Sequence, residues 1–301
     1  MNQMKCPSCG GDQCRVVETI DGEQLATAWK NGGIDVRTAL GCVKSIHLRL
    51  CLRCDLQFFS PVICGGPELY RDLQKNNSYY MDDKWEYRKA LAEINTGNRV
   101  CEVGCGTGAF VKRVNDSGKA KAFGLEMNPD AVAVAVDHGI PVFCDSLERF
   151  KERQQDAVDV VCAFQVLEHL QDPLAFVRLA VEMLGHGGRI ILSMPNRHSF
   201  MKWCGNILDL PPHHVTRWSG AAIEHLLAGC GCHHIKVSYE PLATYHVSHY
   251  ADSLVRRARG TALSGVLAHW RVKKALHTLT SVAPVRALIR GHTLYVSAVV
   301  Q

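Results

Sequence analysis

CEVGCGTGAF, residues 101–110, joins the end of an apolar segment to three glycines at alternate positions. Residues 99–103 predict a β-strand that runs directly into Gly104, Gly106 and Gly108, with a helix expected immediately afterwards. Glycine lets the backbone turn sharply and approach a ligand, because it has no Cβ. The start of the following helix offers unpaired N–H groups that suit a carboxylate or a phosphate. The stretch therefore predicts a ligand-binding loop in a doubly wound α/β sheet.

Strand and helix patterns alternate from Arg99 onward, which is typical of a parallel α/β sheet. Helices are expected to begin at Asn128-Pro129 and Asp172-Pro173, because a capping residue there precedes proline, and a further helix is expected over 219–228. The last two expected strands form a hairpin, so the sheet should be mostly parallel with an antiparallel last strand. The expected strands are 99–103, 122–126, 141–144, 157–164, 189–194, 235–239 and 292–299.

Two acids follow the second and third expected strands. Glu126 stands where a carboxylate can accept hydrogen bonds from ribose hydroxyls, and Asp145 stands where one can reach an adenine amino group. Gly104-x-Gly106-x-x-Ala109 also fits a dinucleotide fingerprint. The charged Glu102 before the loop and the closing hairpin argue against that alternative.

Residues 99–240 resemble the class I methyltransferases that depend on S-adenosylmethionine (SAM). The resemblance rests on VCEVGCGTGAF, GLE, VVCAFQVLEHLQDP and LGHGGRIILSMPN, and GHTLYVSAVV resembles the family's closing antiparallel strand. It implies a Rossmann-like sheet and methyl transfer from SAM. The implied positions are Glu102, Gly104, Cys105, Gly106 and Gly108 around the methionine part of SAM, Glu126 and Met127 at the ribose and adenine, Asp145 and Ser146 at the adenine edge, and Gln165 beside the sulfonium.

Acceptor-side candidates follow the fourth and fifth expected strands, which open on the same edge of the sheet. Gln165, Glu168 and His169 form Q-x-x-E-H, and His213 and His214 follow two prolines. Related ubiquinone-pathway and small-RNA methyltransferases carry a similar E-x-x-E-H segment that binds a divalent metal. Gln165 replaces the first acid here, which argues against a catalytic metal. We therefore expect His213, His214 or His169 to act as base or orienting group, with a structural role for each as the alternative.

The N-terminal cysteines predict a zinc-ribbon-like module. Cys6, Cys9, Cys51 and Cys54 form two Cys-x-x-Cys pairs, the spacing of a four-thiolate structural zinc site. Cys14, Cys42 and His47 lie nearby in sequence and are possible substitute ligands. Ordinary buried cysteines are the alternative.

Four regions follow from these patterns. They are a zinc module (1–66), a helical connector or lid (67–98), a SAM-binding core (99–245), and a basic helical insertion with the closing strand (246–301). The connector carries four aromatic residues that are expected either to cover the cofactor cleft or to pack in helices. These are Tyr79, Tyr80, Trp85 and Tyr87.

A zinc module joined to such a core resembles bacterial methyltransferases found among sugar and surface-polysaccharide enzymes. This implies a small hydroxylated acceptor, such as a nucleotide sugar or a lipid-linked glycan. An RNA or protein methyltransferase that grips its substrate with the module and basic tail is the first alternative, although no aromatic–basic stacking pattern signals nucleic acid. A non-catalytic SAM-binding protein is the second.

Composition adds expectations about location. The chain has 301 residues, 47% of them hydrophobic, 14 cysteines and a net charge of +5. Without a long apolar run or a leader-like start, we expect a cytoplasmic protein in a reducing compartment. Residues 251–301 carry eight Lys or Arg against one acid, Asp252. Residues 263–282, with helical apolar spacing and basic side chains, are predicted to contact a membrane or a lipid-linked substrate.

Overall fold

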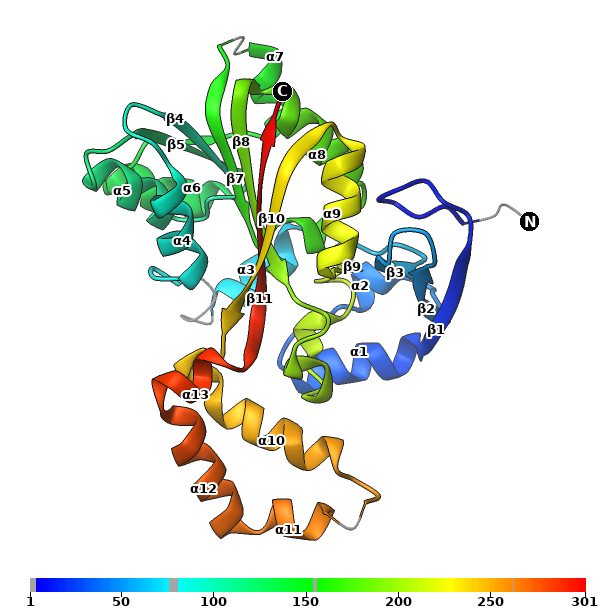
Figure 1. Cartoon of the computed structure of the whole chain (residues 1–301). Coiled ribbons are helices and arrows are strands. Elements are labelled where there is room, and N and C mark those ends of the chain that lie inside the picture. Colours follow the sequence, from blue (N-terminus) through cyan, green and yellow to red (C-terminus); the bar gives the residue numbers. More distant parts are fainter. Residues whose placement is uncertain (1–3, 76–80, 154–155, 262) are drawn as a thin grey trace.

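The computed structural model describes residues 4–75, 81–153, 156–261 and 263–301, and within them a seven-stranded sheet forms the core (Figure 1). Its order is β10-β11-β8-β7-β4-β5-β6. The five strands from β4 to β8 run parallel, while β11 is antiparallel to β8 and β10 is antiparallel to β11. The strands are β4 (Arg99–Val103), β5 (Lys121–Glu126), β6 (Val142–Cys144), β7 (Val158–Phe164), β8 (Leu184–Pro195), β10 (Cys232–Pro241) and β11 (Arg290–Val300).

Helices cover both faces of this sheet, because alternate residues of each strand point to opposite faces and both sets are apolar. In β7, Val160, Cys162 and Phe164 pack against the first helical layer, and Val161 and Ala163 pack against the second. The first layer contains α4 (Trp85–Glu93), α5 (Ala109–Asp116) and α6 (Pro129–Asp137). The second contains α7 (Leu147–Arg153), α8 (Pro173–Glu182) and α9 (Gly220–Gly229).

The expected Rossmann-like sheet with an antiparallel end is therefore confirmed. The expected helix starts are found as well. The Asn128 side chain accepts a hydrogen bond from the backbone N–H of Asp130, and Asp172 caps α8 in the same manner, each followed by proline at the first helical position.

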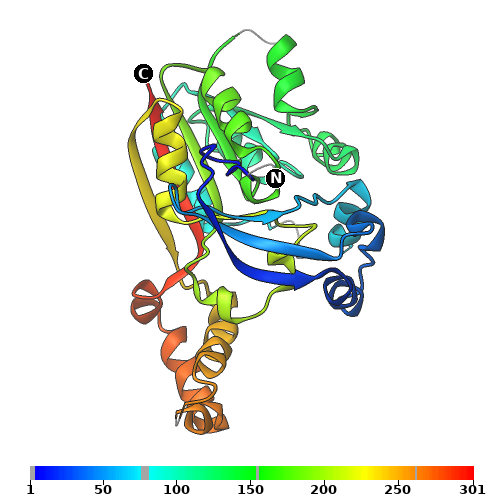
Figure 2. The ribbon, with the colours of Figure 1, turned by 90° about the vertical axis from the view of Figure 1, so that its right-hand side faces the viewer.

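The N-terminal segment builds a second, four-stranded sheet in the order β1-β2-β3-β9 (Figure 2). Three strands come from the module itself, whereas β9 comes from the distant loop that follows His213 and His214. Trp29 of α1 is 1% exposed and lies in the apolar cluster beneath this sheet. The elements are β1 (Cys14–Asp21), α1 (Gly22–Asn31), α2 (Arg37–Leu40), β2 (Ser45–Cys51), β3 (Gln57–Ser60), α3 (Pro67–Gln74) and β9 (Thr216–Arg217).

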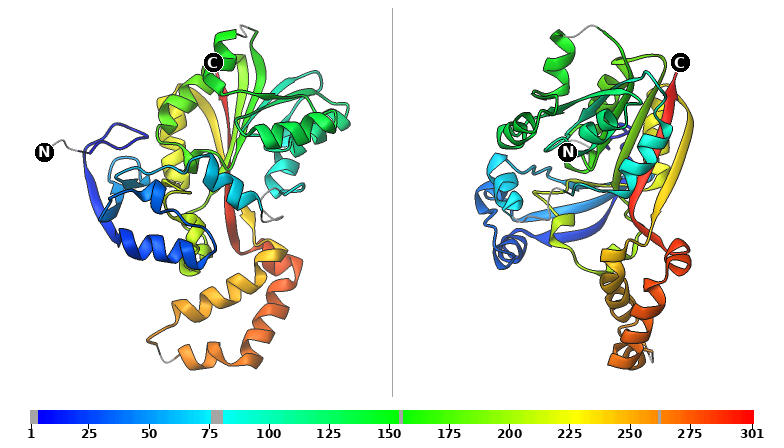
Figure 3. Two further views of the ribbon diagram at one scale, coloured as in Figure 1. Left: turned by 180° about the vertical axis from the view of Figure 1, so that it is seen from behind. Right: turned by 90° about the vertical axis from the view of Figure 1, so that its left-hand side faces the viewer.

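A helical arm inserted between β10 and β11 extends away from the rest of the molecule (Figure 3). Its base packs against Phe200 and Met201. No helix within the described ranges has the length and apolar character needed to cross a bilayer. The arm consists of α10 (Val247–Arg257), α11 (Ser264–Ala268), α12 (Trp270–Ser281) and α13 (Ala283–Ala287).

Candidate functional site

The glycine turn lies at the carboxyl end of β4. Gly104, Gly106 and Gly108 have φ of +72°, +55° and +79°, the left-handed region that favours glycine. A Cβ at Gly104 would lie 2.7 Å from Cγ2 of Val166, and one at Gly108 would lie 2.8 Å from Cγ2 of Ile140. The turn thus needs glycine for space as well as for conformation.

Glu102 precedes this turn and is 1% exposed. Burial raises the pKa of its carboxyl to about 8, and its Oε2 has no hydrogen-bond partner among the residues that the structure describes. A buried carboxylate is costly unless a cation or a donor meets it, so Glu102 is suited to a positively charged ligand. The Cys105 side chain is not directed toward a ligand in this way, because it packs over Gly124 in the core.

Glu126 at the end of β5 is tied to the glycine turn. Its Oε2 accepts from the backbone N–H of Gly106 at 2.9 Å, and its Oε1 accepts from that of Asn128 at 2.8 Å. The Met127 side chain beside it is 74% exposed. An exposed thioether next to a carboxylate offers an apolar surface on which a ring can lie.

Asp145 follows β6 and is 8% exposed. Its backbone N–H donates to the Glu126 carbonyl at 3.1 Å, which brings the two strand ends together. Its side chain accepts from the backbone N–H of Ser146 at 3.0 Å and is paired with Arg153. The structure therefore gathers the expected cofactor residues of three strands at one sheet edge.

Gln165 follows β7 and has a φ of +58°, which is uncommon for a residue other than glycine. Its Nε2 lies 3.5 Å from Oε1 of Glu86 and 3.3 Å from Oγ of Ser193, and that hydroxyl lies 3.4 Å from the same Glu86 oxygen. Burial raises the pKa of the Glu86 carboxyl.

Sequence reasoning missed Glu86. A signal existed, because Glu86 and Ala90 are spaced by four residues and both are buried on one side of α4. Lys84 was missed too. It lies within electrostatic reach of Glu86, Glu102 and Glu168, and its charge partly offsets the rise in pKa that burial causes in each.

The three candidate histidines form one cluster, and one ring nitrogen from each lies within 4.8 Å of the other two. The ring centres of His213 and His214 are 4.5 Å apart and stacked, and the His169 ring is 4.6 and 4.9 Å from them. The connector helps to enclose the cluster, since the Tyr70 ring of α3 lies 5.9 Å from that of His169.

The Nδ1 atom of each histidine faces an oxygen acceptor. His169 Nδ1 lies 2.8 Å from the carbonyl oxygen of His213, and His213 Nδ1 lies 2.8 Å from that of Leu208. His214 Nδ1 lies 3.3 Å from Oδ1 of Asp209. An oxygen acceptor at Nδ1 fixes a proton there, which leaves Nε2 as the ring nitrogen that can carry a lone pair. Burial lowers the pKa of His169, and it lowers that of His213 to about 3, so both rings are neutral at pH 7.

Glu168 completes the surroundings of the cluster. It is 1% exposed, its Oε1 lies 3.9 Å from Nε2 of His169, and burial raises the pKa of its carboxyl to about 8. Neither carboxylate oxygen has a hydrogen-bond partner within the described part of the chain.

The N-terminal module holds the segment that carries His213 and His214. Trp29 Nε1 donates to the carbonyl oxygen of Pro211 at 2.8 Å, and the backbone N–H of Gly65 donates to that of Pro212 at 2.7 Å. The backbone N–H of Phe59 also donates to the carbonyl oxygen of Val215 at 3.0 Å.

The predicted four-cysteine cluster is present. Cys6 Sγ lies 3.6 Å from Cys54 Sγ, Cys9 Sγ lies 3.6 Å from Cys51 Sγ, and all four sulfurs lie within 4.8 Å of one another. Four thiolates about 2.3 Å from a tetrahedral zinc ion would be separated by similar distances. The substitute ligands have other contacts. Cys14 Sγ lies 3.8 Å from the Gly11 carbonyl, and His47 Nδ1 lies 3.0 Å from Oγ1 of Thr19.

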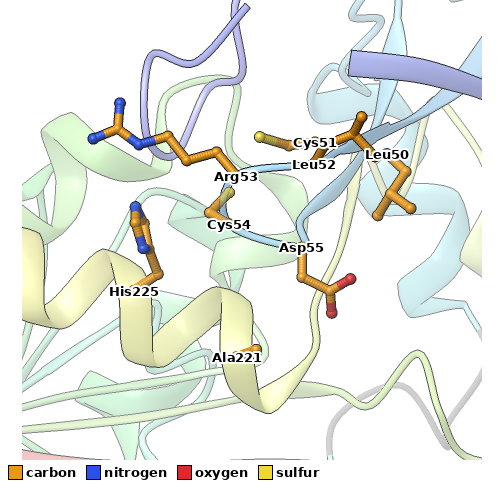
Figure 4. Close-up of a pocket in the computed structure, with 8 residues that line it drawn as sticks. All are labelled: Leu50, Cys51, Leu52, Arg53, Cys54, Asp55, Ala221 and His225. Carbon is orange, nitrogen blue, oxygen red and sulfur yellow. The ribbon is translucent and has the colours of Figure 1, made fainter. Parts of the chain in front are cut away.

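A cavity of about 320 Å³ separates this cluster from α9 (Figure 4). Residues Leu50–Asp55 line one side, and Ala221 and His225 line the other. Asp55 bridges module and core, because it pairs with Arg197 and accepts from the Ser219 hydroxyl at 2.6 Å. The cavity includes no residue of the glycine turn or the histidine cluster, so it belongs to the docking of the module.

The aromatic connector packs in part against the core. Tyr87 is 5% exposed, with its ring 5.3 Å from that of Phe110, and the Trp85 ring lies 5.9 Å from that of Tyr295. Tyr79 and Tyr80 lie outside the described residues.

Comparison with known proteins gives three results. A family model described as a methyltransferase domain matches residues 73–237, more than half of the chain. Proteins named ubiquinone biosynthesis O-methyltransferase are similar, from Aliivibrio fischeri at 31% identity over 34% of this chain and 46% of theirs, and from Xanthomonas oryzae at 33% over 37% and 48%. The chain spans about half the length of these curated relatives.

Among solved structures, a SAM-dependent methyltransferase from Archaeoglobus fulgidus matches with a TM-score of 0.54. The match covers 76% of this chain and 99% of that one, at 15% identity. At that identity it shows the shared fold alone.

Proposed function

Because the chain belongs to the SAM-dependent methyltransferase family, we propose that it transfers a methyl group to an oxygen of a small hydroxylated acceptor, with a sugar or glycan-pathway intermediate as the class to test first. The observation that carries this proposal is the cluster of His169, His213 and His214, in the loops that follow β7 and β8.

The edge formed by β4, β5 and β6 fits SAM. The ligand has a positively charged sulfur and an ammonium group, and the orphaned oxygen of Glu102 suits such charges. The glycine turn is closely packed, because a Cβ at Gly104 would lie 2.7 Å from Cγ2 of Val166. Glu126 and Asp145 would meet the ribose and the adenine, Met127 would lie against the adenine ring, and Gln165 would lie beside the sulfur.

SAM supplies a methyl group that is already activated by its bond to a cationic sulfur. The chain must therefore align the acceptor oxygen, which alone can supply several kcal/mol, and remove its proton. In the balanced reaction a C–O bond forms, the C–S bond breaks, and the hydroxyl proton leaves to a base. Nε2 lone pairs of the histidine cluster can accept a hydrogen bond from a hydroxyl, and Asp209 would stabilise His214 if that ring took up the proton.

Two further features support a small polar acceptor. Two further histidines lie near the cluster. His292 is close enough to Asp209 and His214 for their charges to affect its pKa, and its ring lies 5.7 Å from that of His246. The curated relatives are by name O-methyltransferases. The four-cysteine cluster is proposed to hold a structural zinc ion that stabilises the module beside this site.

Calorimetric titration with SAM and S-adenosylhomocysteine, with NADH as control, tests the cofactor half. We expect both sulfur ligands to bind and Glu126→Ala to lose them. NADH binding in their place would refute the proposal.

Transfer of labelled methyl groups to nucleotide sugars, lipid-linked glycans, catechols, RNA and protein tests the acceptor half. His214→Gln should lower turnover by about 10²-fold or more with SAM affinity retained, and the exposed His138→Gln should not. Labelling of RNA or protein alone would contradict a small acceptor.

A further inference from the structure

We infer that His198, Lys202 and Arg290 form a binding site for a phosphate or diphosphate group at the base of the helical arm. The inference deepens the proposed function, on which its meaning for the acceptor rests. It narrows the acceptor to a hydroxylated compound that carries such a group, a class that includes both nucleotide-linked and lipid-linked sugars.

Two neighbouring chain segments bring these side chains to one place. β8 and β11 are antiparallel, and the backbone N–H of Asn196 continues their pairing by donating to the carbonyl oxygen of His292 at 2.6 Å. The residues that follow Asn196 and those that precede His292 therefore leave the sheet side by side. His198 and Lys202 come from the first segment, and Arg290 comes from the second.

A small apolar cluster fixes this place at the base of the arm (Figure 1). The 3-10 helix η2 (Phe200–Trp203) packs against Leu242 and Val247, where the arm begins, and against Ile289, where it ends. Lys202 therefore stands on an anchored element, and Arg290 is the first residue of β11.

The positive charges of this group are not balanced by acids. Burial lowers the pKa of His198, and the charges of Arg197, Lys202 and Arg290 lower it further, so all three cations act on that ring. Asp55 opposes them, but it is already paired with Arg197. Lys202 and Arg290 make no ion pair with a residue that the structure describes. Such an excess of one charge attracts anions.

Aromatic rings orient two of these cations without neutralising them. The guanidinium carbon of Arg290 lies 4.0 Å from the ring centre of Tyr239, and Nζ of Lys202 lies 5.0 Å from that of Trp203. A cation over a ring keeps its charge, and its N–H donors remain available to an anionic oxygen. Both side chains are exposed to solvent, so a ligand can reach them.

Arg197 provides a second observation that points to an anion. Its side chain is only 10% exposed, and its Nε atom is buried without a hydrogen-bond partner among the described residues. The pair with Asp55 engages a different nitrogen, Nη2. A buried donor without an acceptor is costly, and a negatively charged oxygen beside the guanidinium would reduce that cost.

The basic group adjoins the segment that carries two histidines of the cluster. Asn196 forms a β-bridge with Trp218, and the backbone N–H of Arg197 donates to the carbonyl oxygen of Trp218 at 2.9 Å. His213 and His214 lie shortly before Trp218 in the same segment. One extended acceptor can therefore place its hydroxyl at the histidine cluster and its phosphate at the basic group.

The test is calorimetric titration of the full chain with inorganic pyrophosphate, at low salt and with S-adenosylhomocysteine present. We expect one equivalent to bind. Lys202→Gln with Arg290→Gln should weaken binding by at least about tenfold, because charged contacts to phosphate oxygens are lost. Lys30→Gln with Lys121→Gln makes the same change in net charge at exposed positions elsewhere and should leave the affinity nearly unchanged.

The single variants Lys202→Gln and Arg290→Gln should each show an intermediate loss, and thermal unfolding without pyrophosphate should confirm that they fold. If Arg290→Gln unfolds because it loses its contact with Tyr239, the exposed Lys202→Gln carries the test. A wild type that binds no pyrophosphate at millimolar concentrations, or equal losses in the two double variants, would overturn the inference.

Uridine diphosphate and geranyl diphosphate distinguish the two sources of the diphosphate. Tighter binding of the first than of pyrophosphate would assign a nucleotide-linked acceptor, and tighter binding of the second would assign a lipid-linked one. Either gain should be accompanied by the same loss in Lys202→Gln with Arg290→Gln. A short RNA that binds more tightly than both, with that same loss, would contradict a small acceptor and overturn the inference.

Titration of the same chains with SAM separates this result from the proposed function. Pyrophosphate binding without SAM binding would support the phosphate site and refute the methyltransferase site. SAM binding without pyrophosphate binding would do the reverse.

Discussion

At the scale of one residue, Glu102, which we propose to face the cofactor, carries a cost in stability that follows from its burial. Its carboxyl is buried without a partner on Oε2, and burial raises its pKa from 4.5 to about 8. In the unfolded chain the group ionises near its ordinary pKa, whereas in the folded chain it holds its proton until about pH 8. The folded state therefore loses stability as pH rises from about 4.5 to 8.

Glu102→Gln should remove this loss. Without SAM, the variant and the wild type should unfold at similar temperatures at pH 4.5, and at pH 8 the variant should be more stable by at least ~1 kcal/mol. Its affinity for SAM should fall, because the amide cannot ionise when the cationic ligand binds, whereas the carboxyl can. Thermal unfolding across pH and calorimetry check both. Glu152→Gln, at an exposed position, is the control. If stability depended on pH equally in all three chains, Glu102 would not be the source of the loss.

Gly104→Ala tests the close packing of the glycine turn against Val166. Gly104 and Gly139 have similar φ, +72° and +70°, but a Cβ at Gly104 would meet Val166 at 2.7 Å, whereas one at Gly139 would meet nothing within 4 Å. Both variants should lose about 1 kcal/mol from the left-handed backbone. Only Gly104→Ala should also lose SAM affinity, by tenfold or more. If the two variants had equal effects in calorimetry and denaturant unfolding, this packing would have no role in SAM binding.

At the scale of elements, the contact between α1 and the loop before β9 joins the module to the histidine cluster. Trp29→Phe keeps the ring in the core but removes the N–H that donates to Pro211, leaving a buried carbonyl unsatisfied. We expect a loss of about 1–3 kcal/mol in unfolding free energy, together with lower turnover and an unchanged affinity for SAM. Trp270→Phe in the exposed arm should be neutral in both assays. Lower SAM affinity in Trp29→Phe would contradict the expectation that this contact supports the histidine cluster and not the cofactor site.

The elements of the core could be predicted because their signals are local. Residues 99–103 were bounded by glycines, and Asn128-Pro129 and Asp172-Pro173 carried capping chemistry, so the strands and helix starts agree with the structure. The Cys-x-x-Cys spacing likewise predicted the thiol cluster.

The acceptor side was less predictable, because its contacts join distant parts of the chain. Thr216 and Arg217 form a strand only because β3 pairs with them, which no local pattern indicates. Glu86 reaches Gln165 across 79 positions of sequence, and the convergence of His169 with His213 depends on where two separate loops fold. Tertiary placement outweighs local propensity at such sites.

At the scale of the whole molecule, the arm from α10 to α13 presents a surface that the core does not use. Trp270 is 63% exposed, and the Arg271 guanidinium lies 5.3 Å from its ring centre. Arg271 and Lys274 are exposed on the same helix. These features support the proposal that residues 263–282 contact an anionic membrane surface or a lipid-linked acceptor.

Arg271→Glu with Lys274→Glu should weaken sedimentation with anionic vesicles at low salt by at least about tenfold, since each basic residue near such a surface contributes about 1 kcal/mol. SAM affinity should be unchanged. Lys30→Glu with Lys121→Glu makes the same change in net charge elsewhere and should leave vesicle binding nearly intact. Equal losses in both pairs would indicate non-specific attraction, and no binding by the wild type would exclude the arm as a membrane contact.

The pairing of β3 with β9 has a consequence for how the polypeptide is made. Synthesis releases all four cysteines and the first three strands of the small sheet long before Thr216 and Arg217 leave the ribosome. Until then β3 is an open edge that carries Phe58 and Phe59, and such edges invite association with other chains. A nascent chain arrested before β9 should therefore depend on chaperones until the paired strand becomes available.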